Sequence, residues 1–142
     1  MILFEVINCF RTSDSDKVVE ALNQSDFSII TLKGINIVNK ETFFKQAAQD
    51  IPQPNGLVAE SSWDALNDNL WSSLYEGNSH KIALVWTDAE ELLDNDVQSF
   101  LKAVDLFTFF ARDISSVKRK TNAKSFILVM LGASANFCNP NI

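Results

Sequence analysis

Residues 82–114 read IALVWTDAEELLDNDVQSFLKAVDLFTFFARDI, a short apolar run followed by a long stretch with apolar residues at helical spacing. The run at 82–86 predicts a buried strand, and the stripe after it predicts a helix of about five turns that begins near Asp94 or Asp96. A second all-apolar run, FILVML at 126–131, predicts another buried strand. Strands that are apolar on both faces and alternate with helices are typical of a parallel sheet covered by helices.

The same pattern extends toward the N-terminus. The run FSIITL at 27–32 predicts a further strand, which a Lys-Gly turn ends. A helix that starts at Asn39 and stops at Pro52 follows it, and another helix is expected over residues 62–76. The sequence therefore predicts an α/β fold with a small parallel three-stranded sheet covered by helices.

An additional unit precedes these elements, with a strand expected at 2–10 and a helix at 15–24. Whether this strand joins the same sheet stays open, because edge pairing leaves no local signature. The second half of the long helix is apolar on two sides, so the N-terminal unit is expected to cover its second side. We expect an N-terminal extension packed on the core at 1–26, a main domain at 27–131 and a loose tail at 132–142.

The length and composition of the chain indicate a single folded domain. The chain has 142 residues, 46% of them hydrophobic, with eleven Phe and three Trp that can fill one substantial core. No stretch reaches the roughly 20 apolar residues of a membrane-spanning helix, and the N-terminus lacks the regions of a signal peptide. We therefore expect a cytoplasmic location, where reducing conditions favour free, buried thiols at Cys9 and Cys138 over a disulfide.

Acidic residues are concentrated in one part of the chain. The net charge is −6, which argues against direct nucleic-acid binding because phosphate contacts need a basic surface. Residues 46–101 contain ten acidic groups and one lysine, whereas the remainder carries a net charge of +3. This uneven charge distribution either steers a basic protein partner toward the acidic segment or is simply part of an ordinary solvated surface.

The predicted helix 62–76 gathers acidic and aromatic side chains. On a helical wheel of about 100° per residue, Asp64, Asp68, Trp71 and Tyr75 share one face. The opposite face carries the core stripe, formed by Trp63, Leu66, Leu70 and Leu74. An outward face of carboxylates and rings is typical of a protein-binding surface, since rings supply contact area and carboxylates supply orientation.

Each of these residues also has a purely structural interpretation. Asp64 completes a capping box with Ser61, and Asp68 is a solvated surface acid. Trp71 packs under the N-terminal extension. Asn67, beside the core stripe, is an amide at the edge of the helix.

The stretch SWDALNDNL at 62–70, preceded by Gly56, resembles the motif of the barstar family of ribonuclease inhibitors. The order of elements is similar too: a strand ending in Lys-Gly, a helix with Phe43, the strand IALVW, a long helix and a final apolar strand. The resemblance covers residues 27–131 and implies a barstar-like α/β fold. Residues 1–26 have no counterpart in the minimal family domain.

The resemblance implies that Asp64 and Asp68 are inhibitory carboxylates, with Asp68 entering the nuclease active site in place of a substrate phosphate. It implies an intracellular inhibitor of a basic ribonuclease, an immunity protein to a toxin, that is monomeric when free. Together with the helical wheel, this gives the expected partner-binding residues Asp64, Asp68, Trp71, Tyr75, Asn67, Gly56 and Glu60. The alternative is a barstar-like scaffold that binds a non-ribonuclease toxin or serves as a regulatory interaction module.

The loop before the motif departs from the family. Family members commonly carry aromatic residues beside the Gly, whereas LVAE at 57–60 follows Gly56 here. Trp71 or Tyr75 is the candidate replacement for that aromatic contact. Whether an acid on the long helix, such as Asp105, also contacts the partner stays open.

The sequence does not predict an enzyme, a cofactor or a metal site. His80 is the only histidine, no Ser motif suggests a nucleophile, and the four glycines form no phosphate-binding loop. Metal ligation by Asp94 and Asp96 is conceivable, although helix capping is the simpler interpretation.

Overall fold

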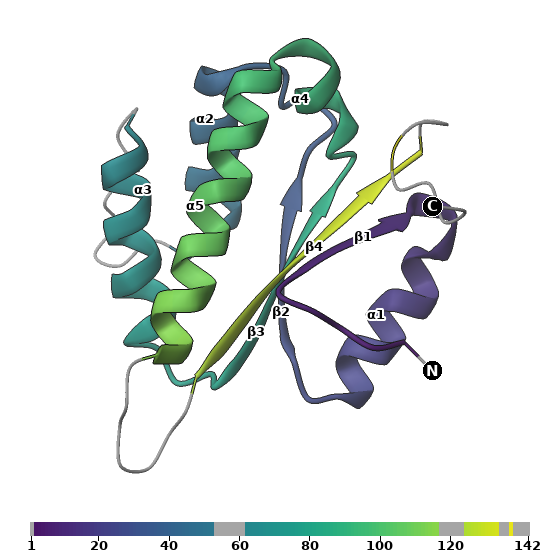
Figure 1. Cartoon of the computed structure of the whole chain (residues 1–142), viewed down its shortest axis with the longest axis vertical. Helices are drawn as coiled ribbons and strands as arrows, with labels where there is room; N and C mark the ends of the chain where they lie inside the picture. Colours follow the sequence, from purple (N-terminus) through teal and green to yellow (C-terminus); the bar gives the residue numbers. More distant parts are fainter. Residues whose placement is uncertain (1, 53–61, 117–123, 134–136, 138–142) are drawn as a thin grey trace.

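The computed structural model describes residues 2–52, 62–116, 124–133 and 137. Its centre is a sheet of four parallel strands in the order β1-β4-β3-β2 (Figure 1). The strands are β1 (Ile7–Arg11), β2 (Ser28–Lys33), β3 (Lys81–Thr87) and β4 (Ser125–Gly132). The α/β class and the parallel sheet are confirmed, but the expected count of three strands is wrong because β1 pairs with β4 as a fourth, edge strand.

The helices lie on both faces of this sheet. They are α1 (Ser15–Gln24), α2 (Lys40–Asp50), α3 (Trp63–Leu70), α4 (Glu90–Asn95) and α5 (Val97–Ser116), and the short turns η1 (Thr12–Asp14) and η3 (Trp71–Tyr75) extend α1 and α3. Figure 1 shows α2, α3 and α5 on one side of the sheet and α1 on the other. The chain therefore forms three layers, helix, sheet and helix.

Side-chain alternation along β3 divides the core into two clusters. Ile82, Leu84 and Trp86 pack in the larger cluster under α2, α3 and α5, whereas Ala83 and Val85 point to the opposite face. This alternation follows from the two-residue period of a strand. Trp86, which is fully buried, is the largest buried side chain of the larger cluster.

The second face of the sheet is covered by α1. Val18 and Leu22 of α1 are fully buried and share a cluster with Val85, Ile127 and Val129 of the strands. The N-terminal unit thus packs on the far side of the sheet from α5. The expectation that it covers the second apolar side of α5 is therefore wrong, because β1 joins the sheet edge and draws α1 to the opposite face.

Side-chain hydrogen bonds cap the starts of α2 and α3, and the expected helix start at Asn39 is confirmed. The side chain of Asn39 accepts from the Thr42 N–H at 2.8 Å, and the two residues form a capping box. Ser62 caps α3 through the Ala65 N–H at 3.1 Å. Because Ser62 is the cap, the proposed capping box of Asp64 with Ser61 is wrong, and Asp64 instead lies in the first turn.

A capping box over residues 87–90 would be expected from TDAE, but α4 begins later. Asp88 adopts a left-handed conformation with φ 48°, so the chain turns before the helix starts and Ala89 becomes the N-cap without a side-chain bond. The Glu90 carboxylate accepts instead from the Ala133 N–H at 3.2 Å.

Residues near both chain ends differ from expectation. Gly132 ends β4, and Phe137 is buried in the larger core cluster, so the stretch expected to be a loose tail contributes to the core. Cys9 is exposed on β1 and disulfide-bonded, so the expectation of a free, buried thiol is wrong for this residue. An edge strand presents alternate side chains to solvent, which explains the exposure of Cys9. Cys138 lies outside the described residues.

Among the helices of the described residues, none combines the length and the apolarity that crossing a bilayer requires.

Candidate functional site

The two acidic residues of the motif lie on the outer surface of α3. Asp64 is in the first turn after the Ser62 cap, where the positive end of the helix dipole stabilises a carboxylate. Asp68 follows one turn later. Both side chains are exposed, as the interpretation of α3 as a binding helix requires.

The two rings expected beside them point elsewhere. Trp71 packs edge-on against Phe110 of α5 with the ring centroids 5.4 Å apart, and Tyr75 lies 5.0 Å from Trp71. Both rings are half-buried and border the larger core cluster. The expectation that Trp71 and Tyr75 share an outward face with the acids is therefore wrong, as is packing of Trp71 under the N-terminal extension.

The local helix geometry explains this difference. After Leu70 the helix widens into the π-helical turn η3, in which the Glu76 N–H donates to the Trp71 carbonyl five residues earlier. A wheel drawn at about 100° per residue no longer applies beyond that point. In addition, α5 contacts α3 at Trp71 through Phe110, so Trp71 lies at the contact between the two helices.

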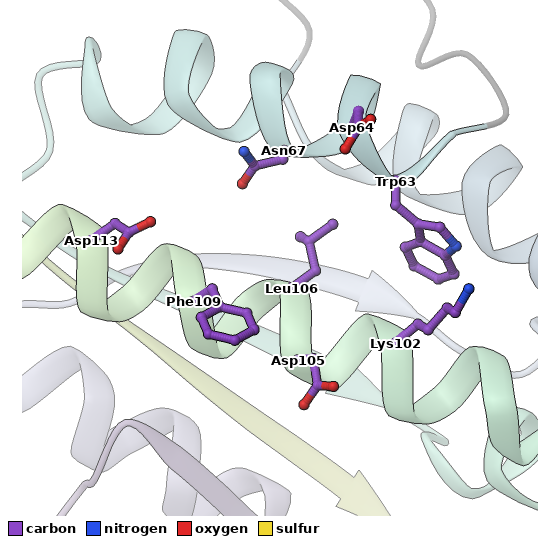
Figure 2. A pocket seen from close by; sticks show the side chains of 8 residues that line it. All are labelled: Trp63, Asp64, Asn67, Lys102, Asp105, Leu106, Phe109 and Asp113. Carbon is purple, nitrogen blue, oxygen red and sulfur yellow. The ribbon is translucent and has the colours of Figure 1, made fainter.

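A pocket of about 430 Å³ opens between α3 and α5. Its lining residues are Trp63, Asp64 and Asn67 of α3 and Lys102, Asp105, Leu106, Phe109 and Asp113 of α5. Figure 2 shows Leu106 projecting from α5 toward α3 between the two helices. The lining brings three carboxylates together with one ammonium, so the pocket favours a cationic partner.

The α3 side of the pocket is held by aromatic packing. Trp63 lies 4.8 Å from Phe44 and 5.5 Å from Phe43, both on α2, as measured between ring centroids. Phe43 and Phe44 are buried. Because Trp63 packs α3 against α2, it fixes the position of the first turn of α3, from which Asp64 projects.

The α5 side is positioned by a cap at the start of that helix. Asp96 accepts from the Ser99 N–H at 3.2 Å and from the Ser99 hydroxyl at 2.7 Å. The Ser99 hydroxyl, followed by the Ser99 N–H, lowers the pKa of Asp96 because both stabilise the ionised carboxylate, and Lys40 adds a smaller attraction. The capping interpretation of Asp96 is thereby confirmed.

The structure brings together only some of the residues expected from the sequence. Asp64 and Asn67 line the pocket, whereas Asp68 lies outside it on the exposed surface of α3. Gly56 and Glu60 lie outside the described residues. Asp105, which sequence reasoning left open, lies in the pocket with Asp64.

Sequence reasoning missed Lys102, Phe109 and Asp113 as site residues. Phe109 was expected to be covered, yet it is 60% exposed, whereas its neighbour Phe110 is fully buried. A helical wheel does distinguish the two phenylalanines, because Phe110 follows Phe107 by three residues and so lies beside the apolar stripe, whereas Phe109 lies on the opposite side of the helix. The sequence shows Asp105 and Asp113 four residues before and after Phe109. That these residues line a pocket follows only from the packing of α3 beside α5.

Metal-binding residues do not gather in the described part of the chain. His80 is exposed just before β3. Within residues 2–52, 62–116, 124–133 and 137, no group of three His, Cys, Asp or Glu side chains is placed to hold a metal ion.

Comparison with known proteins gives one family match. The family model described as Barstar (barnase inhibitor) matches residues 27–130. A search of curated proteins found no match. A solved structure of the ORC2 protein of Aeropyrum pernix, in ADPNP and ADP complexes, is similar with 14% identity and a TM-score of 0.45. That similarity covers 92% of this chain and 36% of the ORC2 chain.

Proposed function

Because the chain belongs to the barstar family, we propose that it is a protein inhibitor that binds and blocks the active site of a basic ribonuclease. The observation that carries the proposal is the pocket between α3 and α5, which Asp64, Asp105 and Asp113 line, together with the exposed Asp68 of α3. In this proposal the carboxylates occupy the positions of substrate phosphates.

Electrostatics supports this choice of partner. The active site of a ribonuclease is basic because its substrate is a polyanion, so an array of carboxylates is complementary to it. Asp68 projects from α3 without lying in the pocket, which leaves it free to enter a cleft of the partner. Asp64 and Asp105 then pair with cations at the rim of that cleft.

The other residues of the motif have supporting roles in the proposal. Trp71 and Tyr75 hold α3 against α5 through Phe110 and so fix the spacing of the carboxylates. Asn67 offers an amide that donates and accepts hydrogen bonds in the pocket. Glu60 and Gly56 precede α3 in the chain and remain predicted partner contacts. A cytoplasmic immunity protein that neutralises a toxin is the cellular role we propose.

Inhibition of barnase, the ribonuclease named in the family description, tests the proposal. The wild-type chain is titrated into barnase at two salt concentrations while cleavage of a fluorogenic RNA is followed. We expect inhibition at a one-to-one ratio that weakens as salt screens the charges. Asp68→Ala should raise the inhibition constant by about 30-fold or more, as expected for a central interface residue.

A matched charge change controls for the net charge of the protein. Glu20 is exposed on α1, on the opposite side of the sheet, so Glu20→Ala should leave inhibition unchanged. Barnase that stays fully active in a large excess of the wild-type chain would contradict the proposed function. Equal inhibition by the wild type and Asp68→Ala would contradict the proposed role of α3.

The alternative, a barstar-like scaffold for another kind of partner, gives a different result. Binding at the nuclease active site must compete with a mononucleotide that occupies that site. If the chain binds barnase with the same affinity in saturating mononucleotide, the inhibitor proposal is wrong and the scaffold interpretation takes its place.

A further inference from the structure

A phenylalanine between two carboxylates forms a regular row on α5. Asp105, Phe109 and Asp113 follow one another at intervals of four residues, and all three line the pocket. Side chains at this spacing lie about 5–6 Å apart at their Cβ atoms on the same side of a helix. Figure 2 shows the Phe109 ring between the two carboxylates along α5.

Phe109 makes little contribution to the core. Its side chain is 60% exposed, whereas Phe107 and Phe110 of the same helix are fully buried. The other exposed apolar residues of α5, Val97 and Leu101, do not line the pocket. An exposed ring at the wall of an acidic pocket is therefore a candidate contact residue for a partner.

The chemistry of this row fits one kind of side chain in particular. A ring face attracts a cation, and the planar guanidinium of arginine stacks on it while its N–H groups reach neighbouring carboxylates. Lysine carries a compact ammonium that cannot stack in this way. Asp105 and Asp113 stand on either side of the ring (Figure 2), about 12 Å apart along the helix, so a guanidinium stacked on the ring donates to one of them at a time.

Two basic side chains of α5 lie near the row. Lys102 lines the same pocket, one turn before Asp105, and Arg112 is the exposed neighbour of Asp113. Lys102 is nearer the Asp105 end, so its repulsion of a second cation is larger there. Arg112 acts in the same way at the Asp113 end, so between the two bases an incoming guanidinium is directed over the ring.

We propose that the row Asp105, Phe109 and Asp113 is the cradle for one arginine side chain of the partner ribonuclease, with Phe109 as the residue that selects arginine over lysine. The inference rests on the proposed function, because it assumes a basic ribonuclease docked on the α3 and α5 face. It assigns to Phe109 the aromatic contact that the loop before α3 does not offer.

Variants of one helix test the role of the ring. Phe109→Ala should weaken binding to barnase by about tenfold or more, because truncating an aromatic contact residue commonly costs that much. Leu101→Ala is the matched control, since Leu101 is 51% exposed on α5 but lies outside the pocket. Phe109→Trp should retain binding, whereas Phe109→Leu, which keeps apolar area without a ring, should weaken it nearly as much as Phe109→Ala.

The identity of the occupant is tested from the partner's side. Each arginine of barnase is replaced singly by lysine, and binding is measured by calorimetry with the wild type and with Phe109→Ala. We expect one replacement to weaken binding to the wild type and to have a smaller effect in the Phe109→Ala background. Asp113→Asn should reduce the effect of the same replacement.

The outcomes separate the two proposals. If Asp68→Ala weakens binding while Phe109→Ala behaves like Leu101→Ala, the cradle is wrong and the inhibitor proposal stands. If Phe109→Ala weakens binding but no arginine replacement is coupled to it, arginine is the wrong occupant. If the wild-type chain does not bind barnase at all, both proposals are wrong.

Discussion

At the scale of single residues, neighbouring side chains of the same type serve different purposes. Phe110 is buried against Trp71 and Phe126, whereas Phe109 is exposed in the pocket. The carboxylate of Asp68 and the ring of Trp71 also differ, although both were assigned to one face. The acid is exposed, and the ring belongs to the contact between α3 and α5.

Trp71→Ala should therefore lower the stability of the free protein. The substitution removes the contacts of the ring with Phe110 and Tyr75 and leaves a cavity between two helices. Because Trp71 is only half-buried, we expect a loss of about 2–3 kcal/mol in the free energy of unfolding, below the range for a fully buried tryptophan. Urea denaturation followed by circular dichroism measures this change.

Asp68→Ala is the reference for that experiment, since its stability should stay within about 0.5 kcal/mol of the wild type. If Trp71→Ala is as stable as Asp68→Ala, the ring does not support the packing of α3 on α5.

At the scale of secondary structure elements, caps set where helices begin and thus where their side chains point. Ser62 starts α3 one residue before Trp63, and Asp96 starts α5 one residue before Val97. Each cap fixes the first turn of its helix by satisfying a backbone N–H that lacks a partner within the helix. A change of helical period redirects side chains further on, because the wider η3 turn after Leu70 turns Trp71 and Tyr75 away from the direction expected for an α-helix.

The Asp96 cap should make stability depend on pH. Its pKa is lowered from 3.8 in the folded protein, chiefly by the Ser99 hydroxyl, so its contribution to stability is present above pH 3.8. That contribution is lost as the pH falls through the lower pKa of the folded state. Asp96→Asn should therefore be less stable than the wild type at pH 7, and the difference should narrow below pH 3.8.

Thermal unfolding of both proteins across this pH range measures the effect. Asp94→Asn is the control for removing one negative charge, because Asp94 is exposed at the end of α4. A stability difference between Asp96→Asn and the wild type that stays constant from pH 7 to well below pH 3.8 would contradict the assigned cap.

At the scale of the whole molecule, the sheet needs helices on both faces. The family match begins at residue 27, yet residues before it supply β1 and α1. Val18 and Leu22 cover the apolar side chains of β3 and β4 on the second face. The N-terminal unit is thus part of the structural core of this chain.

Removal of residues 1–26 should therefore prevent cooperative folding. The truncated chain would expose the β3 and β4 face, formed by Ala83, Val85, Ile127, Val129 and Leu131. We expect the truncated chain to bind a hydrophobic dye strongly and to aggregate, because large exposed apolar patches promote association. In the full chain, Leu22→Ala tests the same contact and should cost about 2–5 kcal/mol. A truncated chain that unfolds cooperatively without binding the dye would contradict this role.

Much of the local structure was decided by the sequence itself. Hydrophobic period located β2, β3, β4 and the long helix, and side-chain chemistry located the Asn39 cap, because both act within a few residues. The motif at 62–70 also indicated the barstar family, and the family match over residues 27–130 then confirmed it. Asp64 and Asn67 were thereby placed in the candidate site before any tertiary contact was known.

Only the tertiary structure decided how these elements meet. The pairing of β1 with β4 joins residues from opposite ends of the chain, and no local pattern encodes such a contact. Which side of α5 receives α3 decides that Phe109 lines a pocket and that Phe110 packs against Trp71. For the same reason, the lining of one pocket by Asp64 and Asp113 is a property of helix packing, which a single-helix wheel does not contain.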